Sequence, residues 1–285
     1  MIQTEKIEFR KLRDFGELIN VTFEFLRQNL KKLGLSILFI VGPLALITGV
    51  IGGIYSASKL NSLSSMQLFT FNLPLLFLHY FFILITAHLL VTVTYSYIFL
   101  YFERDHENID VSDVLQKTKE FFFPFLGISI GVFFAVLLGM LLFVIPGIYL
   151  AITLSTIYAV KMIEGHGFFD SFERCRHLIR NNWWFTFGLI LIFAVIQYFF
   201  SFILQIPMAI VNFVGMMHSV SKGAAGVRVS EFYVVISSLV YMISFFFYTI
   251  GIIGITFHYF NLVEQKEARG LMQKLNNINA TDNIS

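Results

Sequence analysis

The sequence predicts an all-α membrane protein with six transmembrane helices, arranged as three hairpins that each follow a cytoplasmic amphipathic interfacial helix. Composition is the first reason, since 57% of the 285 residues are hydrophobic and 13% are charged, unlike soluble globular domains. The second reason is that long charge-free runs alternate with short charged segments. The third is that basic residues gather in alternate segments, as the two sides of a membrane require.

Residues 1–34 form the first predicted unit, an N-terminal cytoplasmic amphipathic helix. Asp14 is the expected N-cap, with Glu17 in the reciprocal position of a capping box. Apolar residues recur at steps of three and four, which is the spacing of one helix face; they are Phe15, Leu18, Ile19, Phe23, Leu26, Leu30 and Leu33. Residues 35–263 are the predicted six-helix transmembrane domain, and residues 264–285 a cytoplasmic C-terminal tail.

The six crossings follow from charge-free runs about as long as the ~20 residues that a membrane helix needs. Pro146-Gly147 turns the chain between the third and fourth crossings, and the fifth is interrupted by Pro207. Small residues at four-residue spacing suit close helix packing; they are Ala45, Gly49, Gly53 and Ala57, and then Gly127, Gly131, Ala135 and Gly139. We expect crossings near residues 35–55, 71–102, 121–145, 148–160, 184–217 and 232–263.

Two further charged segments precede the second and third hairpins. Residues 103–120 have a weak amphipathic pattern behind an expected Asp110 cap. Residues 164–182 have a stronger one, whose apolar stripe is Phe169, Phe172, Cys175, Ile179 and Trp183. With both termini in the cytoplasm, 17 of the 20 Lys and Arg residues lie inside, and Lys59, Lys222 and Arg228 lie outside. This bias follows the positive-inside rule.

Polar residues within the crossings form helical stripes. The stripe on the sixth crossing is Ser237, Tyr241, Ser244 and Tyr248, the one on the fifth is Gln197, Ser201 and Gln205, and the second crossing carries His88 and Thr92. One interpretation is hydrogen bonding between helices, which satisfies polar groups in lipid. The other is a polar pocket between crossings two, five and six.

A basic and aromatic cluster lies at the start of the fifth crossing. Its members are candidates for binding anionic lipid headgroups; they are Arg174, Arg176, His177, Arg180, Trp183 and Trp184. The alternative is that these side chains only anchor and orient the protein in the membrane.

Several kinds of chemistry leave no pattern in this sequence. The central parts of the crossings carry no Asp, Glu, Lys or Arg, which disfavours ion-coupled transport. There is no P-loop and no G-x-S-x-G motif, so we predict no catalytic residue. His79 and His88 point to opposite faces of one helix, and we predict no metal site and no cofactor. The net charge of +2 does not suggest a nucleic-acid partner.

Ile145-Pro146-Gly147, the short crossing after it and residues 167–184 carry a resemblance. They resemble a broad, largely uncharacterised bacterial family of six-crossing proteins, which includes the membrane domain found with some glycerophosphoryl diester phosphodiesterases. The similarity covers about residues 120–195 and is one of layout elsewhere; Cys175 stands where relatives more often have Ser. It implies a multi-pass protein of the bacterial cytoplasmic (inner) membrane. It implies no catalytic residue, because the phosphodiesterase activity belongs to a separate soluble domain.

Three hypotheses remain from the sequence. The first is a non-enzymatic protein of envelope or lipid homeostasis, or a membrane scaffold, with membrane lipids and another membrane protein as candidate partners. The second is a passive transporter or channel for an apolar or amphipathic solute. The third is a membrane oxygenase acting on a carotenoid or lipid, which needs several converging imidazoles.

Overall fold

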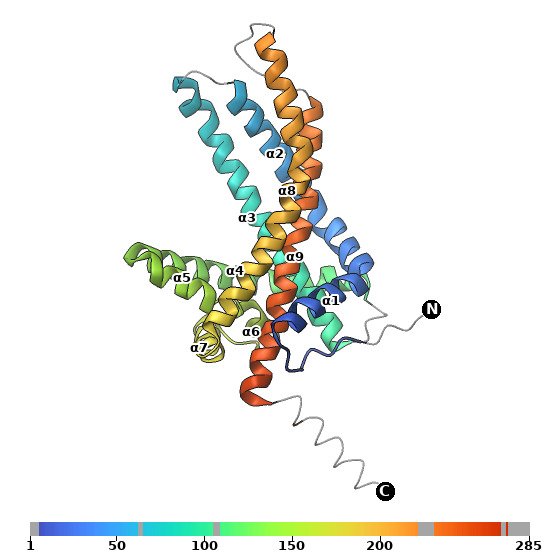
Figure 1. The fold of residues 1–285 in the computed structure, drawn as a ribbon, viewed down its shortest axis with the longest axis vertical. Helices are drawn as coiled ribbons and strands as arrows, with labels where there is room; N and C mark the ends of the chain where they lie inside the picture. The colour runs from blue at the N-terminus through green and yellow to red at the C-terminus, as the bar shows by residue number, and fades with distance from the viewer. Residues whose placement is uncertain (1–5, 62–64, 105–108, 222–230, 269–271, 273–285) are drawn as a thin grey trace.

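The structure is a computed structural model that describes residues 6–61, 65–104, 109–221, 231–268 and 272. Within these ranges the regular structure is entirely helical (Figure 1). Six stretches are long and apolar enough to cross a membrane, so the chain is a multi-pass integral membrane protein, as the sequence predicts. The helices are α1 (Phe15–Ser36), the π-helical turn η1 (Ile37–Val41), α2 (Gly42–Asn61), α3 (Ser65–Glu103), α4 (Val111–Leu142), α5 (Val144–Thr153), α6 (Ile157–Glu164), α7 (Phe168–Ile179), α8 (Trp183–Ser221) and α9 (Glu231–Glu267).

Helix α1 begins at the predicted cap. The Glu17 amide donates to the Asp14 carboxylate at 2.8 Å, and the Asp14 amide donates to the Glu17 carboxylate at 2.9 Å, which completes a capping box. The helix then runs through η1 into α2 without a break. Its buried face differs from the predicted stripe, because Phe23 and Leu30 are exposed; the buried residues are Leu18, Val21, Thr22, Phe25, Asn29, Leu33 and Ser36.

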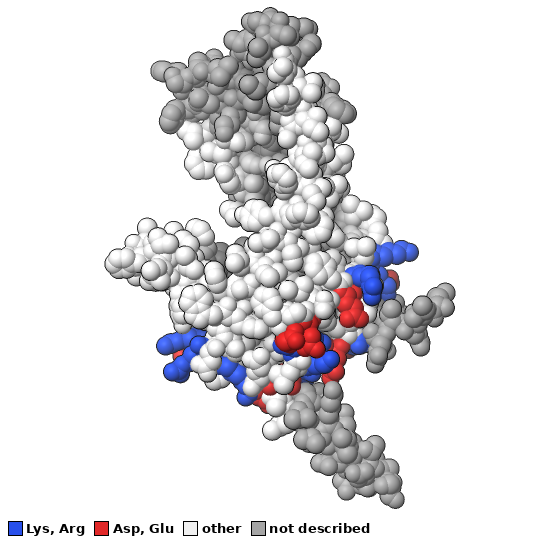
Figure 2. Space-filling view, in the orientation of Figure 1, with Lys and Arg blue, Asp and Glu red and all other residues white. Residues whose placement is uncertain are grey.

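The molecule has two parts. Helices α2, α3, α8 and α9 extend together toward one end, the top of Figure 1, and we call this the upper bundle. Around the other end of α9 lie α1, α6 and α7, which we call the basal layer. Acidic and basic side chains form a band across the basal layer, whereas the described surface above it is free of charge in this view (Figure 2). The charged band therefore marks one face of the membrane.

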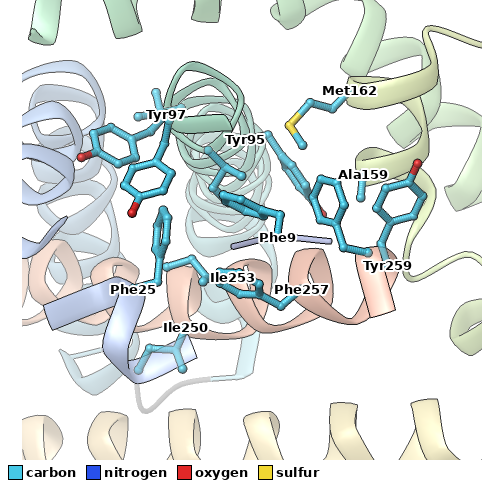
Figure 3. Close-up of a cluster of buried hydrophobic side chains, with 14 of the residues drawn as sticks. Phe9, Phe25, Tyr95, Tyr97, Ala159, Met162, Ile250, Ile253, Phe257 and Tyr259 are labelled. Carbon is cyan, nitrogen blue, oxygen red and sulfur yellow. The ribbon is translucent and has the colours of Figure 1, made fainter. Parts of the chain in front are cut away.

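The basal layer has a dense aromatic core (Figure 3). Phe9 precedes α1 and stacks on Phe257 of α9, with ring centroids 4.9 Å apart. Phe25 of α1 packs edge-on against Tyr101 of α3 at 4.8 Å. The Tyr97 hydroxyl donates to the Asn29 side chain at 2.7 Å. These contacts join α1, α3 and α9.

The first ridge of small residues packs against α9, as the sequence predicts. An added Cβ on Gly49 would lie 2.5 Å from the Ser238 backbone, and one on Gly53 would lie 2.6 Å from Ser237 Oγ. The side chain of Ala57 is outside the described residues. The second ridge is divided: Gly139 meets Gly147 of α5, Gly131 meets Phe168 of α7, and Gly127 has no neighbour within 4 Å.

The charged segments differ in form from the sequence prediction. Residues 111–120 are the first turns of α4, so they do not make a separate helix. Segment α7 is separate, but Phe169 is 82% exposed and leaves the predicted stripe. The fourth predicted crossing is broken between α5 and α6 at residues 154–156. Helix α9 continues to Glu267, past the predicted start of the tail. Residues 222–230 and most of the tail lie outside the described residues.

Candidate functional site

A cavity of about 610 Å³ lies in the upper bundle between α3, α8 and α9. Seven residues of the predicted polar stripes line it: Gln197, Ser201, Gln205, Ser237, Tyr241, Ser244 and Tyr248. They come from α8 and α9, where steps of three or four residues place side chains on one helix face. The polar stripes of α8 and α9 therefore line a cavity, as the second interpretation of these stripes expects.

The residues that α3 contributes to the lining are all apolar, namely Ile83, Ala87, Leu90 and Val91. Tyr198 and Tyr248, which also line the cavity, are 74% and 49% exposed. Because these tyrosines belong to membrane-spanning helices, their exposure opens the cavity toward the lipid.

The hydrogen bonds of the polar lining leave acceptors and donors available. The Ser237 hydroxyl donates to the Val234 carbonyl at 2.9 Å, and the Ser244 hydroxyl donates to the Val240 carbonyl at 2.7 Å. Both oxygens keep lone pairs that can accept. Gln197 and Gln205 also line the cavity, Gln197 partly buried and Gln205 exposed. A carboxamide supplies two donors and one acceptor, so these two side chains are equipped to bind a ligand.

His88 and Thr92 do not line the cavity, although the sequence groups them with the other stripes. The His88 ring makes hydrogen bonds to Ser129 Oγ at 3.2 Å and to the Phe122 carbonyl at 3.1 Å, both on α4. The Thr92 hydroxyl donates to the His88 carbonyl at 2.8 Å. His88 therefore makes the hydrogen bonds between helices that the first interpretation describes, and Thr92 bonds within α3. Neither residue lines this cavity.

His79 adjoins the cavity and is missing from the sequence prediction. It is buried between α2, α3 and α9, with Tyr241 edge-on at 5.7 Å and Tyr55 stacked at 6.0 Å. Gly52 makes room for the ring, because a Cβ there would lie 2.5 Å from it. The His79 Nδ1 atom has no hydrogen-bond partner within the described residues. Gly52 and His79 belong to different helices, so residue spacing within one predicted crossing could not have predicted their contact.

The basic cluster divides into buried and exposed members. Arg174 lies inside the protein: its Nε is 2.9 Å from Glu164 Oε2, and its guanidinium also pairs with Glu267. Burial alone would lower the pKa of Arg174, but the hydrogen bonds that its guanidinium donates to Glu267 and Glu164 outweigh burial and raise that pKa. The Tyr259 hydroxyl donates to Glu164 at 2.8 Å. Arg174 is therefore a structural link between α6, α7 and α9, and is withdrawn from headgroup binding.

The rest of the cluster faces outward. Arg176, His177 and Arg180 are exposed, and Trp184 is 77% exposed. Trp183 is partly buried and stacks on Tyr149 of α5 at 5.9 Å. An exposed set of cations beside indole rings is suited to the boundary between headgroups and acyl chains.

The histidines within the membrane do not meet. His258 of α9 bonds to Thr186 Oγ1 of α8 at 2.8 Å and stacks on Phe185, whereas His88 bonds to α4. Within the described part of the chain, no three His, Cys, Asp or Glu side chains group to hold a metal ion.

No family model, curated protein or solved structure matches this chain. The geometry is therefore the basis for a functional proposal. The geometry combines an uncharged, partly polar cavity in the upper bundle with a basic and aromatic surface in the basal layer.

Proposed function

We propose that this protein is a non-enzymatic integral membrane protein that binds an uncharged amphipathic molecule in the cavity between α3, α8 and α9. It would act in envelope or lipid homeostasis in the bacterial cytoplasmic membrane. This proposal is supported by one observation: seven polar residues of α8 and α9 line a single cavity, to which α3 contributes only apolar residues. An amphiphile matches such a site, because its polar groups meet the hydroxyls and amides while its chains meet α3.

The absence of charge in the cavity lining limits the ligand class. Hydroxyl and carboxamide groups supply its hydrogen bonds, and no residue of the lining is Asp, Glu, Lys or Arg. Burying a charged group without a counter-charge in a membrane interior is costly. A phosphate or carboxylate headgroup inside the cavity is therefore disfavoured, and an alcohol, ester or glycosidic group is favoured.

A second contact with lipid completes the proposal. Arg176, His177 and Arg180 would meet anionic headgroups at the cytoplasmic face, with both chain termini on that side. Replacing Arg176 and Arg180 by Gln should weaken binding to vesicles that contain anionic lipid, since each basic residue near such a surface contributes about 1 kcal/mol. Glu173→Gln, on the same exposed helix, is the matched control and should leave binding unchanged or slightly stronger. Unchanged binding of the arginine variant would remove this part of the proposal.

The ligand site is tested by native mass spectrometry of the protein in a mild detergent. The wild-type chain should retain an uncharged amphiphile at a fixed stoichiometry. Gln197→Leu combined with Gln205→Leu removes both carboxamides of the lining at similar side-chain volume, and we expect retention to fall at least tenfold. Tyr80→Phe removes the hydroxyl of an exposed tyrosine on α3 that does not line the cavity, and should retain the ligand.

Three results would contradict the ligand site. They are a wild-type chain without bound amphiphile, a retained molecule that ignores the glutamine substitutions, and a retained molecule that is anionic. A second protein held in place of a lipid would favour the membrane scaffold instead.

A passive carrier is the second candidate, and the spread of the polar groups favours it. Between Ser237 and Ile252 the lining extends over about 22 Å of α9, most of the ~30 Å hydrocarbon thickness. A solute that moves along α9 would meet a hydroxyl at every turn. Flux of an uncharged amphiphile into proteoliposomes should then fall several-fold in Tyr241→Phe and Tyr248→Phe. Flux that ignores both substitutions would exclude this path.

A further inference from the structure

The hairpin formed by α4 and α5 differs from the other two hairpins at its turn. Basic residues lie at the ends of the other two hairpins: Lys59 is in the last turn of α2, and Lys222 and Arg228 lie between α8 and α9. The turn between α4 and α5 is apolar throughout. Its residues Leu141, Leu142, Phe143, Val144 and Ile145 are between 64% and 80% exposed.

Contacts of α4 limit how deep this turn reaches. Gly131 lies against the Phe168 ring at the start of α7. The chain just before Phe168 belongs to the charged basal layer, where Lys161 Nζ donates to the His166 carbonyl at 2.7 Å. From Gly131 to Leu142, helix α4 rises about 16 Å. The turn therefore lies at most about 16 Å beyond the start of α7, or half of the ~30 Å hydrocarbon thickness.

Contacts of α5 also keep the turn near the basal layer, within a shorter distance. Tyr149 stacks on Trp183, whose indole N–H donates to the Tyr149 carbonyl at 3.5 Å. Trp183 follows Asn182. The side-chain amide of Asn182 donates to the side-chain carbonyl of Gln265 at 3.0 Å, in the basal layer. From Tyr149 to Ile145 is one helical turn, or about 6 Å. In contrast, α8 runs about 57 Å from Trp183 to Ser221.

The backbone of the turn suits a place in lipid. The Phe143 amide donates to the Gly139 carbonyl at 3.1 Å, the Gly147 amide donates to the Phe143 carbonyl at 3.4 Å, and Pro146 has no amide hydrogen. Backbone groups in the hydrocarbon layer need such internal partners. Gly139 and Gly147 also allow the two arms to approach closely, since a Cβ on either would lie within about 3 Å of the other arm.

We infer that α4 and α5 form a re-entrant hairpin, which enters and leaves the bilayer through the basal face and ends among the acyl chains of that leaflet. Figure 1 agrees, since this hairpin projects sideways from the molecule and ends well below the top of the upper bundle. The protein then crosses the membrane four times, through α2, α3, α8 and α9. It is broader in the leaflet that holds the hairpin, which makes it a wedge for that leaflet.

Cysteine accessibility in sealed vesicles of both orientations tests this inference without reference to the cavity or its ligand. The native Cys175 is fully buried and forms no disulfide, so it gives a silent background. The test variants are Val144→Cys and Ile145→Cys at the turn. Arg176→Cys is the control for the basal face, and Met217→Cys, about 51 Å beyond Trp183 along α8, is the control for the opposite face.

The expected result is that a membrane-impermeant maleimide labels each control from its own face and labels the turn from neither. After labelling in detergent and reconstitution, a bimane at the turn should be quenched most by phospholipids brominated in mid-chain. Labelling of the turn from the face that exposes Met217→Cys would show a full crossing and overturn the inference. Labelling from the basal face would place the hairpin on the membrane surface and overturn it as well. Two neighbouring turn positions guard against one variant that fails to fold.

Discussion

The two halves of α9 use polar residues in opposite ways. Residues 253–264, in the basal layer, are buried on all sides. Their polar side chains bond to protein groups: His258 bonds to Thr186, Asn261 accepts the Arg13 amide at 2.9 Å, and Tyr259 bonds to Glu164. Two of their buried nitrogens, His258 Nδ1 and Asn261 Nδ2, have no partner within the described residues. Residues 234–252, in the upper bundle, include exposed and buried positions, and four of their polar side chains line the cavity, namely Ser237, Tyr241, Ser244 and Tyr248.

This difference separates structural from functional polarity. A buried polar group with a partner contributes to stability, and loss of the partner costs the desolvation of the group left behind. A polar group that faces a cavity gives little to stability and remains available to a ligand. Substitutions in the two halves should therefore affect different measurements.

The largest effect is expected at the ion-pair node of the basal layer. Glu164→Ala removes one of the two carboxylates paired with Arg174 and the acceptor of the Tyr259 hydroxyl. It should lower the free energy of unfolding by about 3 kcal/mol, the lower end for a broken buried pair, because Glu267 still pairs with Arg174. The measurement is the unfolding midpoint in detergent. Glu173→Ala, on the exposed face of α7, should change the free energy by less than about 0.5 kcal/mol. Equal effects of the two variants would show that the ion pairs of Arg174 contribute no more to stability than an exposed carboxylate does.

Replacing an amide by leucine in each half of the protein compares the two regions directly. Asn261→Leu leaves the buried Arg13 amide without its acceptor, and should cost about 1–3 kcal/mol of unfolding free energy. Gln197→Leu in the cavity should be neutral within about 0.5 kcal/mol but should reduce ligand retention. If Gln197→Leu destabilised the protein as strongly as Asn261→Leu, the cavity glutamine would be a structural residue.

Glycine-to-alanine substitutions probe the packing of the upper bundle. Gly49→Ala brings a methyl group onto the Ser238 backbone, so α2 and α9 must separate at a cost of about 1–3 kcal/mol. Gly127→Ala meets no neighbour and should stabilise α4 by up to about 1 kcal/mol through helix propensity. Thermal unfolding of both variants under one set of conditions should give shifts of opposite sign.

The smallest effect concerns the buried thiol. Burial raises the pKa of Cys175 from 9.0 to about 12, although a hydrogen bond from Thr156 opposes the shift. Below pH 9 the thiol is protonated in both folded and unfolded states, so it adds no pH dependence. Above pH 9 the unfolded state loses its proton first, and stability should fall by up to about 1.4 kcal/mol per pH unit. Cys175→Ala should abolish that slope between pH 9 and 10, and an identical slope would contradict the assignment.

Much of the fold was predictable because a helix within the membrane requires a long, uninterrupted run of apolar residues. The charge-free runs give six helices of sufficient length, the Asp14 cap is found where a carboxylate precedes a helical pattern, and Gly49 and Gly53 pack against α9. Each of these depends on neighbours in sequence or on the solvent that surrounds a segment.

The faces of the amphipathic helices were less predictable. Phe23, Leu30 and Phe169 are apolar but exposed, while Asn29 and Ser171 are buried. The reason is that α1 and α7 meet protein on one side, so the apolar side chains that remain outside have lipid as a neighbour. Hydrophobicity does not distinguish a protein core from an acyl chain.

The sequence by itself determined the class of this protein, its helices and the two polar stripes that line the cavity. Only the tertiary structure decided that His88 and Thr92 are absent from that cavity, that His79 lies beside it, and that Arg174 is withdrawn into an ion-pair node. It also decided how far the turn at Pro146 lies from the basal layer. The physical reason is that helix periodicity fixes the direction of a side chain from its own axis, whereas contacts between helices distant in sequence fix what it meets.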